Sequence, residues 1–133
     1  MKQDESLPIT RKIHEIRGNK VMLDFDLASL YGIKTKALRQ AVKRNIERFP
    51  EDFVFQLKKD EMDELVTKCD QLPPGFKHNP YGVWAFTELG VAMLSSVLRT
   101  SSAINMNIAI MRAFILLRKM LLEEEGVHQR ISQ

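Results

Sequence analysis

Hydrophobic positions in residues 24–53 recur with the spacing of two short helices. The first helix carries apolar residues three and four positions apart, the stripe of an amphipathic helix: Leu27, Leu30 and Tyr31. Asp26 is predicted as its N-cap, because the carboxylate can accept hydrogen bonds from first-turn amides. Gly32 is predicted to end the helix, where a left-handed residue without a Cβ is favoured.

The second helix is predicted over residues 35–49. Thr35 can cap its start, and Pro50 ends it because the residue before a proline is pushed out of helical geometry. Residues at helical spacing form its apolar side: Leu38, Ala41, Val42, Ile46 and Phe49. Two helices joined by a short turn that contains glycine indicate a helix-turn-helix.

The rest of the chain mixes strand-like and helix-like patterns, which predicts a single α+β domain over residues 1–125. Before the two helices we expect a loose arm at 1–8 and a β-hairpin of 13–17 and 21–23 that turns at Gly18-Asn19. After them we expect a strand at 53–57, a helix at 60–69 with Asp60 as cap and Asp63 in the capping box, a loop at 70–82 and a strand at 83–86 that pairs with 53–57. The remaining elements are a helix at 87–98, a long C-terminal helix at 101–125 capped by Ser101 or Ser102, and a frayed tail at 126–133. Because two strands joined by a loop follow the helix-turn-helix, the predicted architecture is winged-helix-like, with a small antiparallel sheet.

The predicted helix at 101–125 is apolar over two stripes. One stripe consists of Ile110, Phe114, Leu117 and Leu121, and the other of Ile104, Ile108, Met111, Ile115 and Leu122. A single core contact does not cover so much of a helix circumference. We expect one side to pack on its own domain and the second stripe to form a homodimer interface. Burial of both sides within one monomer is an equally supported alternative.

Positive charge is concentrated on the second predicted helix. Residues 34–48 hold six basic residues and one acid, a net of +5, whereas the whole chain carries +3. A helix with an apolar back and a cationic front suits the DNA major groove, where phosphates supply affinity and base edges supply specificity. The alternative is a solvated basic face on an ordinary core helix. The glycine-containing turn immediately upstream favours DNA binding.

The predicted DNA contacts fall into two groups. Side chains expected to reach base edges are Lys36, Arg39, Gln40 and Lys43, since Gln pairs well with adenine and Lys with guanine acceptors. Side chains expected to hold phosphates are Lys34, Arg44, Arg48 and Lys77. Lys77 and His78 lie in the 70–82 loop, in the position of a wing. An exposed proline-rich connector is an equally supported interpretation of this loop.

The residues that could carry chemistry do not form a catalytic or metal-binding pattern. His14, His78 and His128 show no metal-ligand spacing, and Cys69, on a predicted apolar stripe, is expected to be a small core residue. We therefore expect no enzyme activity, no metal and no cofactor.

The sequence shows neither a hydrophobic leader nor an apolar run of about 18 residues, so a cytoplasmic location without membrane contact is the expectation.

Three sequence blocks carry a family resemblance. They are VMLDFDLASLYGIKTKALRQAVKRNIERFPEDFVFQLKKDE, AFTELGVAMLSSVL and NIAIMRAFILLR, which together cover roughly residues 21–118. In this order they resemble the phage-associated ORF-six N-terminal domain, a relative of the KilA-N and Bro-N domains. The resemblance implies a DNA-binding domain of phage and prophage-derived proteins, often joined to another domain in antirepressor-like regulators.

These observations predict the DNA-binding domain of a phage- or prophage-derived transcriptional regulator that binds double-stranded DNA as a homodimer. The alternative is an antirepressor-type protein-interaction module that acts through the apolar C-terminal helix, with another phage or host regulator as its partner. DNA binding would weaken steeply with salt, whereas association through an apolar helix would be nearly insensitive to it.

Overall fold

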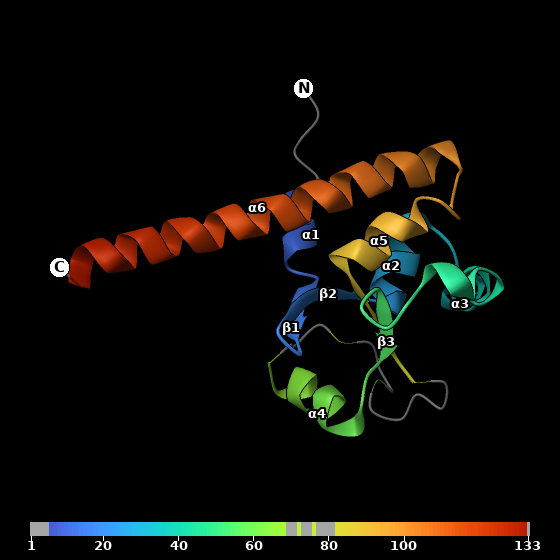
Figure 1. Cartoon of the computed structure of the whole chain (residues 1–133), viewed down its shortest axis with the longest axis horizontal. Helices are drawn as coiled ribbons and strands as arrows, with labels where there is room; N and C mark the ends of the chain where they lie inside the picture. Colours follow the sequence, from blue (N-terminus) through green and yellow to red (C-terminus); the bar gives the residue numbers. More distant parts are fainter. Residues whose placement is uncertain (1–5, 69–71, 73–75, 77–81, 133) are drawn as a thin grey trace.

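The computed structural model describes residues 6–68, 72, 76 and 82–132 (Figure 1). Its elements are α1 (Ser6–Thr10), β1 (Ile13–Ile16), β2 (Asn19–Leu23), α2 (Asp24–Tyr31), α3 (Thr35–Arg44), the 3-10 helix η1 (Ile46–Arg48), β3 (Val54–Gln56), α4 (Lys59–Lys68), β4 (Trp84–Thr87), α5 (Glu88–Leu94) and α6 (Ser101–Ser132). The predicted α+β class is confirmed, including the N-terminal hairpin, the antiparallel sheet and the long C-terminal helix.

In the described part of the chain, four antiparallel strands form one sheet in the order β1-β2-β4-β3. The predicted pairing of residues 53–57 with 83–86 is confirmed, with Phe55 opposite Ala85. β4 also pairs with β2, so that Met22 lies opposite Phe86. α2 and α3 lie in the chain between β2 and β3, and these two strands flank β4 in the sheet.

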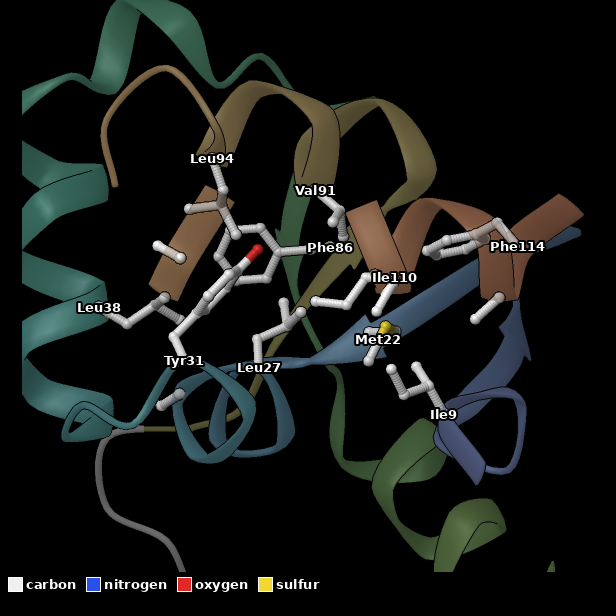
Figure 2. Packing of buried hydrophobic residues seen from close by; sticks show 14 of the residues in the cluster. Ile9, Met22, Leu27, Tyr31, Leu38, Phe86, Val91, Leu94, Ile110 and Phe114 are labelled. Atoms are coloured by element: carbon white, nitrogen blue, oxygen red, sulfur yellow. The ribbon is translucent and has the colours of Figure 1, made fainter. Parts of the chain in front are cut away.

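Buried apolar side chains of the described residues lie on both faces of this sheet. Met22 and Phe86 point to one face, where α1, α2, α5 and α6 cover them with Leu27, Val91 and Ile110 (Figure 2). Val21, Leu23 and Ala85 point to the other face, where residues of α4 cover them. This alternation follows from the two-residue period of a strand, and it buries both faces.

The hairpin turn differs from the prediction by one residue. Ile16 pairs with Asn19, so the turn consists of Arg17 and Gly18 rather than Gly18 and Asn19. Both turn residues have positive φ, 55° and 75°. This is the type I′ geometry that matches the twist of the flanking strands. The sequence reading failed because arginine is an uncommon residue at positive φ.

The predicted N-caps of four helices are wrong. Leu23 precedes α2 and Lys34 precedes α3, neither with a side-chain cap bond, so Asp26 and Thr35 lie inside the first turns. α4 begins before Asp60, and the Glu61 carboxylate accepts from the Lys58 backbone N–H at 2.8 Å.

The cap of α6 is Thr100 rather than Ser101 or Ser102, because the Thr100 hydroxyl accepts from the Ala103 N–H. The predicted opening of α5 is confirmed, because the Thr87 hydroxyl accepts from the Gly90 N–H.

Several predicted helix ends are also wrong. α3 ends at Arg44 instead of residue 49, because the Asn45 side-chain amide donates to the Ala41 carbonyl that would continue the helical ladder. α5 ends at Leu94 instead of residue 98. Residues 6–8 belong to α1, which packs on α6, rather than to a loose arm. The tail predicted to fray from residue 126 continues α6 to Ser132.

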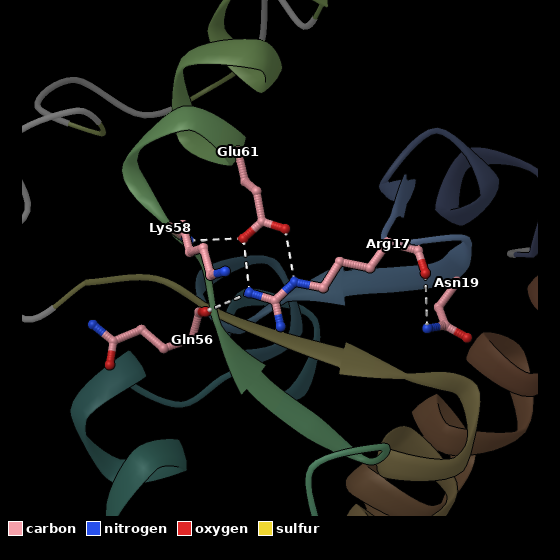
Figure 3. A network of polar contacts seen from close by, with 5 residues as sticks. All are labelled: Arg17, Asn19, Gln56, Lys58 and Glu61. Atoms are coloured by element: carbon pink, nitrogen blue, oxygen red, sulfur yellow. Dashed lines mark hydrogen bonds and ion pairs between the residues drawn. The ribbon is translucent and has the colours of Figure 1, made fainter.

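A polar network ties the hairpin turn to α4 (Figure 3). The Arg17 guanidinium donates to both carboxylate oxygens of Glu61, at 2.8 and 2.9 Å, and to the Gln56 carbonyl. It also lies 4.2 Å from the centroid of the Phe55 ring. The hydrogen bond from Arg17 is the main cause that holds the pKa of Glu61 below its ordinary value of 4.5.

This pKa shift predicts a pH-dependent part of the folding stability. Because the folded-state pKa of Glu61 is lowered, the stabilisation is complete above about pH 4.5 and is lost as the pH falls through the folded-state value. Glu61→Gln should lower the free energy of unfolding at pH 7 by up to about 1 kcal/mol and flatten its fall below pH 4.5. Urea unfolding at several pH values measures this. The control is Glu64→Gln, because Glu64 pairs only with exposed Lys68 among the ion pairs described; an equal effect of both variants would contradict the prediction.

Candidate nucleic-acid interface

α3 presents a cationic front and an apolar back. Leu38 and Val42 are fully buried, with no exposed surface, and pack in the core beside Phe86 and Leu94. The side chains predicted to reach base edges lie on the opposite side and are exposed: Lys36, Gln40 and Lys43. They are spaced four and three residues apart, so they follow one line along the helix. The structure therefore brings these three side chains together on the surface.

The predicted phosphate-binding residues surround this front. Lys34 precedes α3, Arg44 is its last residue and Arg48 belongs to η1, and all three are exposed. The Arg48 guanidinium donates to the Ser96 hydroxyl at 3.1 Å, which links η1 to the segment after α5. Lys77, His78 and Cys69 lie outside the described residues.

Arg39, which was also predicted as a base contact, lies in a different environment from the other three side chains. Its guanidinium pairs with the Asp24 carboxylate at 2.6 Å and donates to the Gly82 carbonyl at 2.6 Å. Its side chain is only 13% exposed, and Asp24 is fully buried. Periodicity placed Arg39 beside Lys36 and Gln40, but the tertiary structure directs its charge inward. Arg39 therefore holds α3 in place instead of extending the exposed front.

Asp24 is a structural centre that the sequence reading missed. One carboxylate oxygen accepts from Arg39 Nε at 2.8 Å and from the Trp84 backbone N–H at 3.2 Å, and the other accepts from the Phe25 N–H. These bonds connect the start of α2 with α3 and β4. The sequence signal that could have identified Asp24 is an acidic residue directly after an apolar strand. Such a residue is at risk of burial, and a buried carboxylate requires hydrogen-bond or ion-pair partners.

Trp84 is a second residue that the sequence reading missed. The centroid of its ring lies 5.4 Å from the Arg39 guanidinium carbon and 5.9 Å from Lys43 Nζ. The residue is half-buried. Cations near an indole face are attracted by the ring quadrupole. Trp84 therefore helps to orient two of the cationic side chains of α3 from the neighbouring strand.

The turn between α2 and α3 has the predicted glycine. Gly32 adopts φ 72° and ψ 29°, and the Ile33 N–H donates to the Ala28 carbonyl at 3.0 Å. Such a left-handed C-cap closes a helix and redirects the chain. The prediction for Gly32 is thus confirmed, and α2 packs against α3 across this turn.

The two apolar stripes of α6 lie in different environments. In the first stripe Ile110 and Phe114 are buried in the core with at most 1% exposed surface, whereas Leu117 is half-buried and Leu121 is 39% exposed. The stripe predicted to form a dimer interface is exposed except for half-buried Met111: Ile104, Ile108, Ile115 and Leu122 are 45–65% exposed. The alternative that both stripes are buried within one monomer is therefore wrong.

Residues 11–97 match the ORF6N domain. This match covers more than half of the chain, and the chain belongs to the phage-associated ORF6N domain family. No curated protein and no solved structure matches this chain. Among the described residues, no helix has the length and apolar character needed to cross a membrane.

The Asp24–Arg39 pair predicts a large stability loss when it is broken. Arg39→Met leaves the buried Asp24 carboxylate without its cation, which should lower the free energy of unfolding by about 3–5 kcal/mol. Lys36→Met removes an exposed cation from the same helix and should change it by less than about 0.5 kcal/mol. Urea unfolding monitored by circular dichroism provides both values.

A second variant separates charge burial from lost packing. Asp24→Asn combined with Arg39→Met removes both charges but keeps a side-chain oxygen that can accept from the Trp84 or Phe25 backbone N–H, and it should recover much of the stability lost in Arg39→Met alone. A double variant as unstable as the sum of the single variants would show that the ion pair is not the relevant interaction.

Proposed function

We propose that this chain is a phage-type transcriptional regulator domain that binds double-stranded DNA by inserting α3 into the major groove. The observation that carries the proposal is the exposed line of Lys36, Gln40 and Lys43 on a helix whose opposite side is fixed in the core. The ten residues of α3 span about 15 Å, and the major groove, about 12 Å wide, admits one helix.

The described side chains suggest a division of roles. Lys36, Gln40 and Lys43 reach base edges, because they occupy the centre of the exposed front. Lys34, Arg44 and Arg48 contact phosphates from its margins. Arg39 and Asp24 position the helix without touching DNA, because their charges are paired inside the fold.

The DNA proposal predicts different effects for residues at the centre and margin. Gln40→Ala should relax base preference at one position, at a cost of about 1–3 kcal/mol if Gln40 is bidentate to a base. Arg44→Ala should weaken binding to all duplexes alike and reduce the slope of log affinity against log salt by about 0.9. Selection of bound duplexes from a random pool, followed by titrations at two salt concentrations, measures both effects.

The matched control removes an exposed cation far from α3. Lys59→Ala, at the start of α4, should leave both affinity and base preference unchanged. A sequence-selective loss in Arg44→Ala would contradict the division of roles, and an equal loss in Lys59→Ala would contradict the assignment of α3 as the interface.

A second candidate function is supported by the exposed apolar residues of α6. An antirepressor-type module would use this face to bind another phage or host regulator. Salt separates the two functions, because DNA binding weakens steeply with ionic strength and association through apolar side chains does not. Binding to a partner that is insensitive to salt, together with no affinity for any duplex in the pool, would favour this alternative.

The exposed stripe of α6 also supports homodimerisation of the DNA-binding form. Contiguous exposed apolar surface marks interaction sites in soluble proteins, and a two-fold dimer would bind an operator with two-fold symmetry. The proposed interface residues are Ile104, Ile108, Met111, Ile115 and Leu122.

Replacing one stripe residue tests the dimer. Ile108→Glu should shift the protein toward monomer at tens of micromolar, because it buries an unpaired charge in the interface. Ile46→Glu is the control, since Ile46 is 57% exposed on η1, outside the stripe. Sedimentation velocity measures both. A wild-type protein that is monomeric at this concentration would contradict the dimer. It would not affect the DNA-binding proposal, which is tested by the duplex titrations.

A further inference from the structure

A second surface, formed by Gln56 and Trp84, adjoins the cationic front of α3. Gln56 on the edge strand β3 lies opposite Trp84 on β4, so both side chains are on the same face of the sheet. Gln56 is exposed and Trp84 is half-buried. The sheet therefore presents a side-chain amide beside an indole ring at this position.

Direct contacts join this surface to α3. The Arg39 guanidinium donates to the Gly82 carbonyl at 2.6 Å. A Cβ placed on Gly82 would lie 2.2 Å from Gln56 Nε2, so the Gln56 amide lies directly against the Gly82 backbone. Lys43 Nζ of α3 lies 5.9 Å from the centroid of the Trp84 ring. Gln56, Trp84 and the front of α3 are thus parts of one continuous surface.

The hydrogen-bond donors of this surface are available to a ligand. Gln56 takes part in the polar network of Figure 3 only through its backbone carbonyl, and its side chain points away from that network. Neither the Gln56 amide nor the Trp84 indole N–H has an acceptor within the described part of the chain. The indole nitrogen is not fully buried, since Asn107 Nδ2 is the only buried side-chain donor or acceptor of the described residues that lacks a partner. Two acids lie close by, Asp24 and Glu61, and each is paired with an arginine.

The position of α3 in a major groove determines what would lie over this surface. The groove is about 12 Å wide and a helix with its side chains is about 10–12 Å across, so one DNA strand passes on each side of α3. Arg44 lies about 140° around the helix from Arg39, because five residues advance by about 500°. Arg44 therefore borders one strand. On the side of Arg39, whose charge is directed inward to Asp24, the second strand meets Gln56 and Trp84 instead.

We propose that the sugar-phosphate backbone of this second strand crosses Gln56 and Trp84, which form an additional DNA contact beside α3. The Gln56 amide and the indole N–H donate to phosphate oxygens, the acceptors that receive most protein–DNA hydrogen bonds, and the ring packs against the adjacent deoxyribose. Both side chains are uncharged, so the contact adds affinity without neutralising a phosphate. This inference rests on the proposed function and extends its interface from α3 to the sheet.

An uncharged contact has its own salt signature. Gln56→Ala should weaken binding to duplexes selected from the random pool by about twofold to tenfold, the range of one neutral hydrogen bond. It should leave the slope of log affinity against log salt unchanged, in contrast to Arg44→Ala. Trp84→Phe keeps an aromatic ring against α3 but removes the N–H, and it should have an effect of the same size. Anisotropy of a labelled duplex at two salt concentrations measures the affinities, and circular dichroism verifies that the variants are folded.

Trp84 also reports on this contact directly, because it is the only tryptophan of the chain. Its emission should change as duplex is added and saturate with the Kd obtained from anisotropy. Bound duplex should also protect the ring from quenching by acrylamide. N-acetyltryptophanamide in a parallel titration corrects for the light that DNA absorbs.

Asn19→Ala is the matched control, since it removes an exposed amide at the start of β2 and should leave duplex affinity unchanged. If the wild type binds duplexes but Gln56→Ala behaves like Asn19→Ala, or if Trp84 stays open to acrylamide, this contact is overturned and the α3 interface stands. Single-stranded DNA that binds as tightly and protects Trp84 equally would overturn the seating against a duplex. A wild-type protein that binds no duplex would overturn the proposed function and this contact with it.

Discussion

The buried ion pair between Asp24 and Arg39 is the interaction on which the arrangement of α2 and α3 depends. Asp24 stands where β2 ends and α2 begins, and its oxygens bind Arg39 of α3 and the Trp84 amide of β4. A buried carboxylate without these partners would be strongly unfavourable. The pair therefore sets the position of α3 against both the sheet and α2, and with it the direction in which Lys36, Gln40 and Lys43 point.

The cationic helix α3 and the long helix α6 are connected through α2. Tyr31 is the last residue of α2, directly before the Gly32 turn into α3, and its hydroxyl donates to Asn107 on α6. Burial raises the pKa of Tyr31, so this hydroxyl remains a donor at physiological pH. One hydrogen bond thus joins the end of α2, directly before the turn into α3, to the helix that carries the proposed dimer interface.

Sequence reasoning succeeded where a structure depends on neighbouring residues and failed where segments compete. The Gly32 turn, the strands β3 and β4 and the α+β class followed from local composition and periodicity. The cap at Asp26 was wrong because α2 begins directly after β2, with Leu23 as its N-cap and no side-chain cap bond. The cap at Asp60 was wrong because α4 begins at Lys59, with the Lys58 N–H bonded to the Glu61 carboxylate. The end of α3 was wrong because the Asn45 side chain takes the Ala41 carbonyl, a competition that apolar periodicity does not register.

By itself the sequence determined that a basic helix with an apolar back follows a glycine turn. Helical periodicity, and the left-handed glycine that ends a helix, depend only on a few adjacent residues. Only the tertiary structure decided that Arg39 turns inward, because its partner Asp24 is 15 residues away and the third participant, Trp84, is 60 residues from Asp24. It also decided which stripe of α6 is exposed. Both stripes are apolar, and the difference arises from α1, α2 and α5 covering one side of the helix and leaving the other open.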